Sequence, residues 1–186
     1  MVALIRTEKV WERMRKQMLR QVPLSDRRNL SEANYMIIDH IGITVRSLEA
    51  GIAHWEKTFG YRQMTEIIEN TRQKVRVVFL SKEDSLPVKL IEPKDDSSTI
   101  AGLAKKGGGL HHICFRCEDL EAGVRKLKEL GLRILVEPQA GEAFENEKIA
   151  FIYDGHGLNI ELIDTEKRAG RLGIAAFKDG ERMGED

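Results

Sequence analysis

The sequence predicts an α+β fold in which two tandem βαβββ modules form one open, cupped, β-barrel-like sheet, preceded by an N-terminal helical extension. Three observations support this prediction: an internal repeat, the same order of strand and helix patterns in both copies, and an amphipathic N-terminal stretch. At an offset of 72 residues, residues 40–93 match residues 112–165 without a gap. One register kept over several segments indicates a duplication.

The repeat divides the chain into parts. His40 corresponds to His112, and the tetrapeptide Leu-Glu-Ala-Gly at 48–51 recurs at 120–123. The predicted organisation is a helical extension at 1–34, a domain at 35–165 with repeat one at 35–93 and repeat two at 110–165, and a tail at 166–186.

The extension at 1–34 is rich in arginine and lysine and has one apolar face. Apolar residues recur there at intervals of three to seven residues, which predicts an amphipathic helix. Glu8 and Glu12 argue against a targeting peptide, because such peptides contain few acidic residues. We expect this helix to pack on its own domain or on a partner subunit. The polar tail at 167–186 is assigned no role.

Each repeat has the pattern of one strand, one helix and three further strands. Apolar, β-branched runs at 35–45 and 110–117 predict the first strands, since such residues suit the half-buried surface of a sheet. Ser47 and Asp119 are predicted N-caps, because their side-chain oxygens can accept from free amides of the following helix. The helices are expected at 48–59 and 120–130, ending near Gly60 and Gly131, with later strands at 61–68, 74–81, 87–93, 132–137, 147–153 and 158–164 and a short helix at 99–105.

Period-two alternation places the two matched histidines on one face of the first strands. His40 shares a face with Gly42 and Thr44, and the apolar residues between them are expected to pack on the helix. Equivalent positions in a duplicated fold are related by a pseudo-twofold axis, so we expect His40 and His112 to face one cavity, together with Glu161. Two imidazoles and a carboxylate suit a divalent ion such as Co²⁺, Ni²⁺, Mn²⁺, Fe²⁺ or Zn²⁺.

Several segments resemble the vicinal-oxygen-chelate superfamily, which includes glyoxalase I, fosfomycin-resistance proteins, extradiol dioxygenases and methylmalonyl-CoA epimerases. The resemblance covers residues 35–165 and is strongest to the epimerases. The segments that carry it are DHIGITV at 39–45, IEP at 91–93, STI at 98–100, KKGGGLHHI at 105–113 and LNIEL at 158–162.

This resemblance implies an enzyme, namely a divalent-metal-dependent isomerase or epimerase. His40, His112 and Glu161 correspond to the metal ligands of the family. The implied reaction removes the proton α to a thioester and returns it on the other face through a metal-stabilised enolate, with Glu161 as one base. The implied partners are a small-molecule substrate of the acyl-CoA type and, because related proteins often pair, a second copy in a homodimer.

Lys89 departs from the epimerase pattern. It is the repeat partner of Glu161 and stands where these epimerases usually carry glutamine or glutamate as a further ligand. A protonated lysine cannot bind a metal, so we expect Lys89 to act on the substrate by binding a carboxylate or phosphate. A neutral, basic lysine and an ion pair with Glu161 in a metal-free site are alternatives. A second departure is the turn at 153–157, where the epimerases usually carry a His-Pro-Lys segment.

Two rival functions fit the same residues. One is a glyoxalase-like lyase or a glutathione-dependent isomerase, and the other is a metal-free small-molecule binding protein with a Lys89–Glu161 pair. Epimerisation also needs a second acid or base. Val77 and Val78 occupy the strand where a glutamate is expected, which leaves Glu145 as a weak candidate.

The composition argues against other classes of partner. Thirty basic and thirty acidic residues leave no net charge, so nucleic acid is not an expected partner. No apolar stretch is long enough to span a membrane and no signal-peptide core is seen, so a cytoplasmic protein is expected. Cys114 and Cys117 face opposite sides of their strand and are not expected to bind zinc. By the same alternation His111 is expected to point away from His112.

Overall fold

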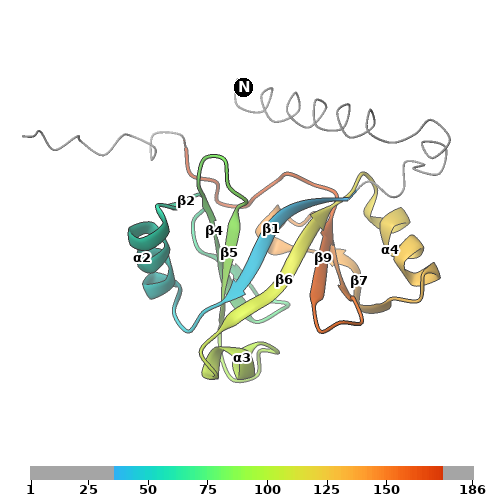
Figure 1. Cartoon of the computed structure of the whole chain (residues 1–186), viewed down its shortest axis with the longest axis horizontal. Coiled ribbons are helices and arrows are strands. Elements are labelled where there is room, and N and C mark those ends of the chain that lie inside the picture. Colours follow the sequence, from blue (N-terminus) through green and yellow to red (C-terminus); the bar gives the residue numbers. More distant parts are fainter. Residues whose placement is uncertain (1–35, 174–186) are drawn as a thin grey trace, which may run out of the picture. The chain divides into compact units, whose positions relative to one another are not determined.

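The computed structural model describes residues 36–173, and the helix predicted at 1–34 lies outside this range. The described part forms one mixed sheet of nine strands with few helices (Figure 1). The first half contains β1 (Ile37–Thr44), α2 (Leu48–Phe59), β2 (Arg62–Gln63), β3 (Ile68–Asn70), β4 (Val75–Ser81) and β5 (Val88–Pro93). The short α3 (Ala101–Lys105) leads to the second half, with β6 (Gly109–Arg116), α4 (Leu120–Glu129), β7 (Arg133–Ala140), a 3₁₀ turn (Glu142–Phe144), β8 (Lys148–Tyr153) and β9 (Asn159–Ile163).

The two halves meet at the centre of the sheet, where β1 and β6 run antiparallel. The strand order is β2-β4-β5-β1-β6-β9-β8-β7, and β3 also pairs with β4. Outside the central pair, β5 runs parallel to β1 and β9 runs parallel to β6. Among the described strands, β2 pairs only with β4 and β7 pairs only with β8. The prediction of an open sheet is therefore confirmed: the sheet is mixed and is not closed into a barrel.

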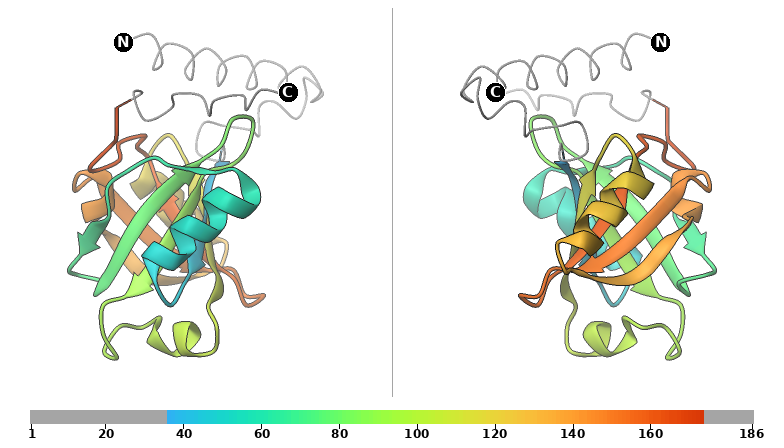
Figure 2. Two further views of the ribbon diagram at one scale, coloured as in Figure 1. Left: turned by 90° about the vertical axis from the view of Figure 1, so that its left-hand side faces the viewer. Right: turned by 90° about the vertical axis from the view of Figure 1, so that its right-hand side faces the viewer.

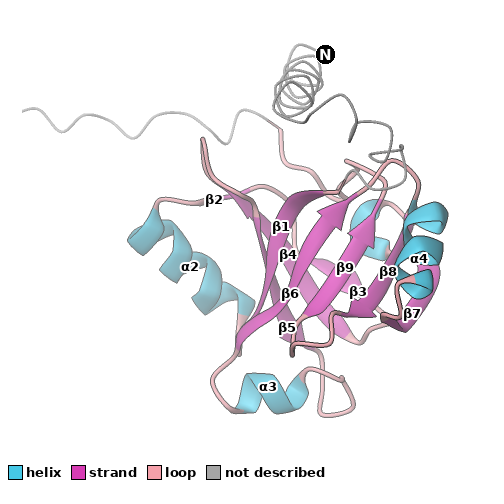
Figure 3. Ribbon diagram, turned by 45° about the vertical axis from the view of Figure 1, so that its right-hand side comes forward, coloured by secondary structure: helices cyan, strands magenta, loops and turns pink. Residues whose placement is uncertain are grey.

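The two longer helices begin at the predicted caps and lie against different halves of the sheet (Figure 2). The side chain of Ser47 accepts a hydrogen bond from the third residue of α2, and Asp119 does the same for α4. Gly60 ends α2 in the left-handed conformation, with φ of 70°. Figure 3 shows α3 at the connection between the halves. None of the described helices has the length and apolar composition needed to cross a membrane.

The single strand predicted at 61–68 is wrong, because the structure divides this segment into β2 and β3. Thr65 interrupts the ladder, and its hydroxyl accepts a hydrogen bond from the amide of Phe79 at 3.0 Å. The chain after β9 supplies the missing backbone partner, since Arg171 forms a β-bridge with Thr65. The described part of the tail, to which the sequence assigned no role, therefore completes the edge of the sheet.

Candidate functional site

The two matched histidines lie on the central strand pair. His40 of β1 and His112 of β6 are both fully buried, and their Nε2 atoms are 3.3 Å apart. Gly42 lies opposite His112 in the ladder. A Cβ atom on Gly42 would lie 2.2 Å from the His112 ring. Glycine is therefore needed at position 42, because the imidazole of His112 lies directly over it.

Glu161 joins the histidines from β9, which is the neighbour of β6. Its backbone pairs with Cys114, and its side chain is fully buried. The Oε2 atom lies 3.0 Å from Nε2 of His40 and 3.0 Å from Nε2 of His112. The structure thus brings together the three side chains that the sequence placed in one cavity.

Lys89 reaches the same carboxylate from β5 on the other side of the central pair. Its Nζ atom donates to Oε1 of Glu161 at 3.0 Å and to Oε2 at 3.1 Å. Both side chains are buried. Burial raises the pKa of Glu161, but the Lys89 charge and the contacts with His112 and His40 outweigh burial and hold this pKa well below its usual range. Glu161 is therefore a carboxylate at neutral pH.

Asp39 contacts the Nδ1 side of the His40 ring, opposite the Nε2 atom that faces Glu161, and Arg168 binds Asp39. The Nδ1 atom of His40 is 2.7 Å from Oδ1 of Asp39, and Arg168 donates to the same oxygen. Burial raises the pKa of Asp39, but the His40 hydrogen bond and the Arg168 charge outweigh burial and lower the pKa. Arg168 also lies over the rings of Phe79 and Phe144, with centroid distances of 4.8 and 4.7 Å. Asp39 therefore fixes the orientation of the His40 ring.

His111 faces the cavity, and the expectation that it points away is wrong. Its Nδ1 atom is 2.8 Å from Nδ1 of His112. The register between β1 and β6 shifts between the pairs Gly42–His112 and Ile43–Leu110, so His111 is an extra residue on β6. A bulge of this kind re-aims a side chain that strict alternation would send to the other face. Periodicity alone could not reveal this bulge.

Burial and neighbouring charges keep His111 and His112 neutral. Burial lowers the pKa of His112 to about 3, although the charge and hydrogen bond of Glu161 oppose this effect. The pKa of His111 is also lowered, first by burial and then by the Lys89 charge. Each ring therefore carries a single hydrogen on its nitrogens at neutral pH.

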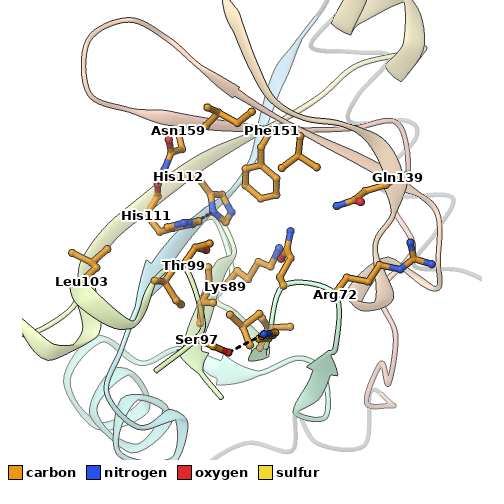
Figure 4. A pocket seen from close by; sticks show the side chains of 18 residues that line it. Arg72, Lys89, Ser97, Thr99, Leu103, His111, His112, Gln139, Phe151 and Asn159 are labelled. Atoms are coloured by element: carbon orange, nitrogen blue, oxygen red, sulfur yellow. Dashed lines mark hydrogen bonds between the residues drawn. The ribbon is translucent and has the colours of Figure 1, made fainter. Parts of the chain in front are cut away.

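A cavity of about 700 Å³ opens beside these residues (Figure 4). Lys89, His111 and His112 line it, whereas Glu161 and His40 are not among the lining residues. The carboxylate and the His40 ring therefore lie behind the groups that face the cavity. The remaining wall is partly apolar and partly basic, and it includes Arg72, Lys74, Val77, Ile91, Leu135 and Phe151.

The two cysteines lie apart, as predicted. Cys114 belongs to the apolar cluster around Phe79 and Phe144, whereas Cys117 packs in the cluster under α4. Burial raises the pKa of the Cys117 thiol to about 11 and that of Cys114 well above its ordinary value. Both thiols are therefore protonated and unreactive at neutral pH.

The donor atoms of His40, His112 and Glu161 could hold a metal ion. These atoms all lie within 4.8 Å of one another. The contact between His40 Nδ1 and Asp39 directs the Nε2 atom of His40 toward the other two donors, as in many metal-binding histidines. By donor type and spacing, the three side chains fit a divalent ion.

Lys89 does not fit this arrangement. An ion bound to Oε2 of Glu161 would lie about 2 Å from that oxygen, and Nζ of Lys89 is 3.1 Å from the same atom. The ion and the ammonium would therefore be at most about 5 Å apart, which costs on the order of 7 kcal/mol at an effective dielectric constant of about 20. This repulsion is about half of what a structural zinc site gains. While Lys89 is an ammonium, the four residues do not fit a divalent ion.

The chain is similar to known proteins over the same residues. The profile of the Glyoxalase/Bleomycin resistance protein/Dioxygenase superfamily matches residues 39–151. The ethylmalonyl-CoA/methylmalonyl-CoA epimerase of Cereibacter sphaeroides is 30% identical over 129 residues, which are 67% of this chain and 95% of that protein. The mitochondrial methylmalonyl-CoA epimerase of Bos taurus is also 30% identical, over 67% of this chain and 72% of that protein.

Solved structures are similar as well. The crystal structure of methylmalonyl-CoA epimerase from Mycobacterium tuberculosis has a TM-score of 0.62 and 33% identity, covering 68% of this chain and 86% of that one. A methylmalonyl-CoA epimerase in complex with methylmalonyl-CoA and NH₄⁺ has a TM-score of 0.62 and 31% identity, covering 73% of this chain and 97% of that one.

Proposed function

Because the chain belongs to the glyoxalase/bleomycin resistance protein/dioxygenase superfamily, we propose that it is an epimerase acting next to the carbonyl group of an acyl-CoA thioester. The observation that carries the proposal is the buried Lys89–Glu161 pair beside His112, in which Lys89 and His112 line a cavity large enough for an acyl group. The relatives named as epimerases of methylmalonyl-CoA support methylmalonyl-CoA as the first substrate to test.

Glu161 is the base of the proposed reaction. Its carboxylate accepts the α proton, and the electron pair of the broken C–H bond moves toward the thioester oxygen to give an enolate. Lys89 covers this carboxylate on the side of the cavity. A carboxylate group on the substrate attracts the ammonium, and the flexible lysine side chain can turn toward it and uncover Glu161. Lys89 therefore both binds the anionic substrate and stabilises the enolate.

The proton must return on the opposite face to invert the carbon. His111 is assigned this step: its ring lies at the cavity wall and gives its one hydrogen to the enolate carbon. Glu161 passes the proton it accepted back to His111 through His112, which lies 3.0 Å from Glu161 and 2.8 Å from His111, so that both residues return to their starting states. Glu145, the candidate suggested by the sequence, is exposed and is not among the lining residues. Protonation of the enolate carbon restores the thioester with the opposite configuration.

The basic part of the cavity wall suits the CoA portion of the substrate. Arg72 and Lys74 carry positive charge there, and guanidinium and ammonium groups bind phosphate oxygens through charge-assisted hydrogen bonds. Neighbouring apolar residues, including Leu103 and Leu135, can cover the methylene groups of the acyl chain.

A metal-dependent form of the same reaction is the second candidate. The spacing of the donor atoms of His40, His112 and Glu161 favours it. A divalent ion such as Co²⁺, Ni²⁺, Mn²⁺, Fe²⁺ or Zn²⁺ would act there as a Lewis acid on the carbonyl oxygen. A homodimer and a cytoplasmic location complete the proposal.

Proton NMR of methylmalonyl-CoA in D₂O tests the reaction directly. The wild-type protein should replace the proton at C2 with deuterium, both with EDTA and with Co²⁺ tested separately. Glu161→Gln should slow exchange at least about 100-fold, which is the lower range for loss of a general base. The matched control is Glu166→Gln, which removes an exposed carboxylate and should exchange like the wild type.

Absence of exchange above the buffer rate in every condition would reject the epimerase. Conversion of the substrate to a product with a different carbon skeleton would instead favour a lyase. Saturable binding of methylmalonyl-CoA without exchange would favour the metal-free binding protein.

A further inference from the structure

The carboxylate of Glu161 already has a full set of partners. Oε1 accepts from Lys89, and Oε2 lies within 3.1 Å of Lys89, His40 and His112. A carboxylate buried in this way needs a counter-charge, because an isolated buried anion is very costly. Lys89 supplies that charge from within the chain. The ammonium also lies 4.9 Å from the ring centre of Phe144 and 5.7 Å from that of Phe79, where cation–π attraction favours it.

The three donor atoms already contact one another. Nε2 of His40 lies 3.3 Å from Nε2 of His112, and Oε2 of Glu161 lies 3.0 Å from each of them. Hydrogens on the imidazole rings can bridge atoms at these distances, so the contacts among the three side chains need no ion.

We infer that Lys89 supplies the cation of this site from within the chain and takes the electrostatic place of a divalent ion. One part of this inference rests on the proposed function: the Lys89 ammonium stabilises the enolate by donating hydrogen bonds, with no metal–oxygen bond. The other part, that the wild-type protein needs no metal ion, rests on the geometry alone. The position of Lys89, at the cavity wall and in front of Glu161, suits both roles.

Metal titration of the whole 186-residue chain tests the inference without reference to turnover. Purified protein is treated with EDTA, dialysed and titrated with Co²⁺, and bound metal is followed by calorimetry, visible absorption and elemental analysis. The wild type should bind less than 0.1 Co²⁺ per chain at a free concentration of about 10 µM. Its melting temperature should not change with Co²⁺ or EDTA.

Lys89→Gln is the decisive variant, because a neutral amide oxygen can complete the ligand set without repelling the ion. This variant should bind one Co²⁺ per chain at least about 100-fold more tightly than the wild type, and adding His112→Ala should abolish that binding. The matched control is Lys94→Gln, an exposed lysine paired with Glu69, which should behave like the wild type.

Stoichiometric, tight binding of Co²⁺ by the wild type overturns the inference, whether or not Lys89→Gln folds. Equal, weak binding by the wild type and a folded Lys89→Gln also overturns it, because Lys89 would then not be what excludes the ion. The proposed function fails separately: a metal-free wild type that gains a site in Lys89→Gln but exchanges no proton would keep the inference and reject the epimerase.

Discussion

Positions 89 and 161 are equivalent in the two halves of the sheet, but they carry opposite charges. Each lies on a strand that runs parallel to one member of the central pair, Lys89 on β5 beside β1 and Glu161 on β9 beside β6. The histidines between them are matched in identity and in burial. The two halves thus share one scaffold and differ at the residue that decides the charge of the site.

This difference shows how a duplicated fold can acquire an internal counter-ion. Two acidic residues at these positions would repel each other in the buried centre and would attract a cation from solution. One lysine and one glutamate instead neutralise each other at 3.0 Å. The predictions below test this comparison.

The largest effect is expected when one member of the pair loses its charge. Glu161→Gln should lower the free energy of unfolding by about 3–5 kcal/mol, because it leaves the Lys89 ammonium buried without a counter-charge. Urea denaturation followed by circular dichroism measures this loss. The double variant Glu161→Gln with Lys89→Met should recover part of the lost stability. As a control, Glu121→Gln removes the carboxylate of an exposed pair and should cost less than about 1 kcal/mol. A double variant as unstable as the sum of its singles would show that the pair is not coupled.

The next effect concerns Gly42 and its repeat partner Cys114. Gly42→Ala should cost about 1–3 kcal/mol, because the new methyl group overlaps the His112 ring. Cys114→Ala removes a buried sulfur and should cost about 1 kcal/mol. Thermal and urea unfolding of both variants provide the comparison. Equal losses would mean that the His112 ring can move aside freely.

Acid should destabilise the protein through His112. Its pKa is about 3 in the folded protein against an ordinary value of 6.5. The unfolded chain binds more protons between these values, so the free energy of unfolding falls as the pH is lowered through this window. A loss of about 2 kcal/mol between pH 7.5 and pH 5 is expected from this residue.

Urea denaturation at both pH values measures this acid-dependent loss. His112→Asn should reduce the loss, whereas His54→Asn, at an exposed position, should not. The same pH dependence in both variants would argue against a neutral, buried His112.

The smallest effect is expected at the two helix caps. Ser47→Ala and Asp119→Ala should each cost about 1 kcal/mol, because each removes the acceptor for a free amide of its helix. Asp119→Ala should cost slightly more, since its negative charge also favours the positive end of the helix. Chemical denaturation of the two variants measures the difference. No loss in either variant would mean that water replaces the side-chain acceptor.

The local pattern of the sequence was sufficient for helices α2 and α4 and for the residues of the central strands. Ser47 and Asp119 predict the starts of α2 and α4 because capping depends on atoms within one turn. Alternation places His40 and His112 on the buried face for the same local reason. Alternation failed at His111, where a bulge between strands from different halves changes the direction of the side chain.

The break at Thr65 and the position of Arg168 were also beyond local reasoning. Both depend on a segment after β9 that returns to the edge of the first half, where Arg171 pairs with Thr65. Arg168 then reaches Asp39, which is 129 residues earlier in the chain. No short window of sequence contains both partners of such a contact.

By itself, the sequence determined the repeat, the class of fold and the residues that could carry chemistry, because these follow from periodicity and residue type. Only the tertiary structure decided how those residues act together. It placed Lys89 on both oxygens of Glu161 and left the carboxylate behind the cavity wall. The physical reason is that the charge of this buried site depends on the contact between Lys89 and Glu161, which are 72 residues apart in the sequence. The distance between these two side chains depends on the folding of the whole sheet.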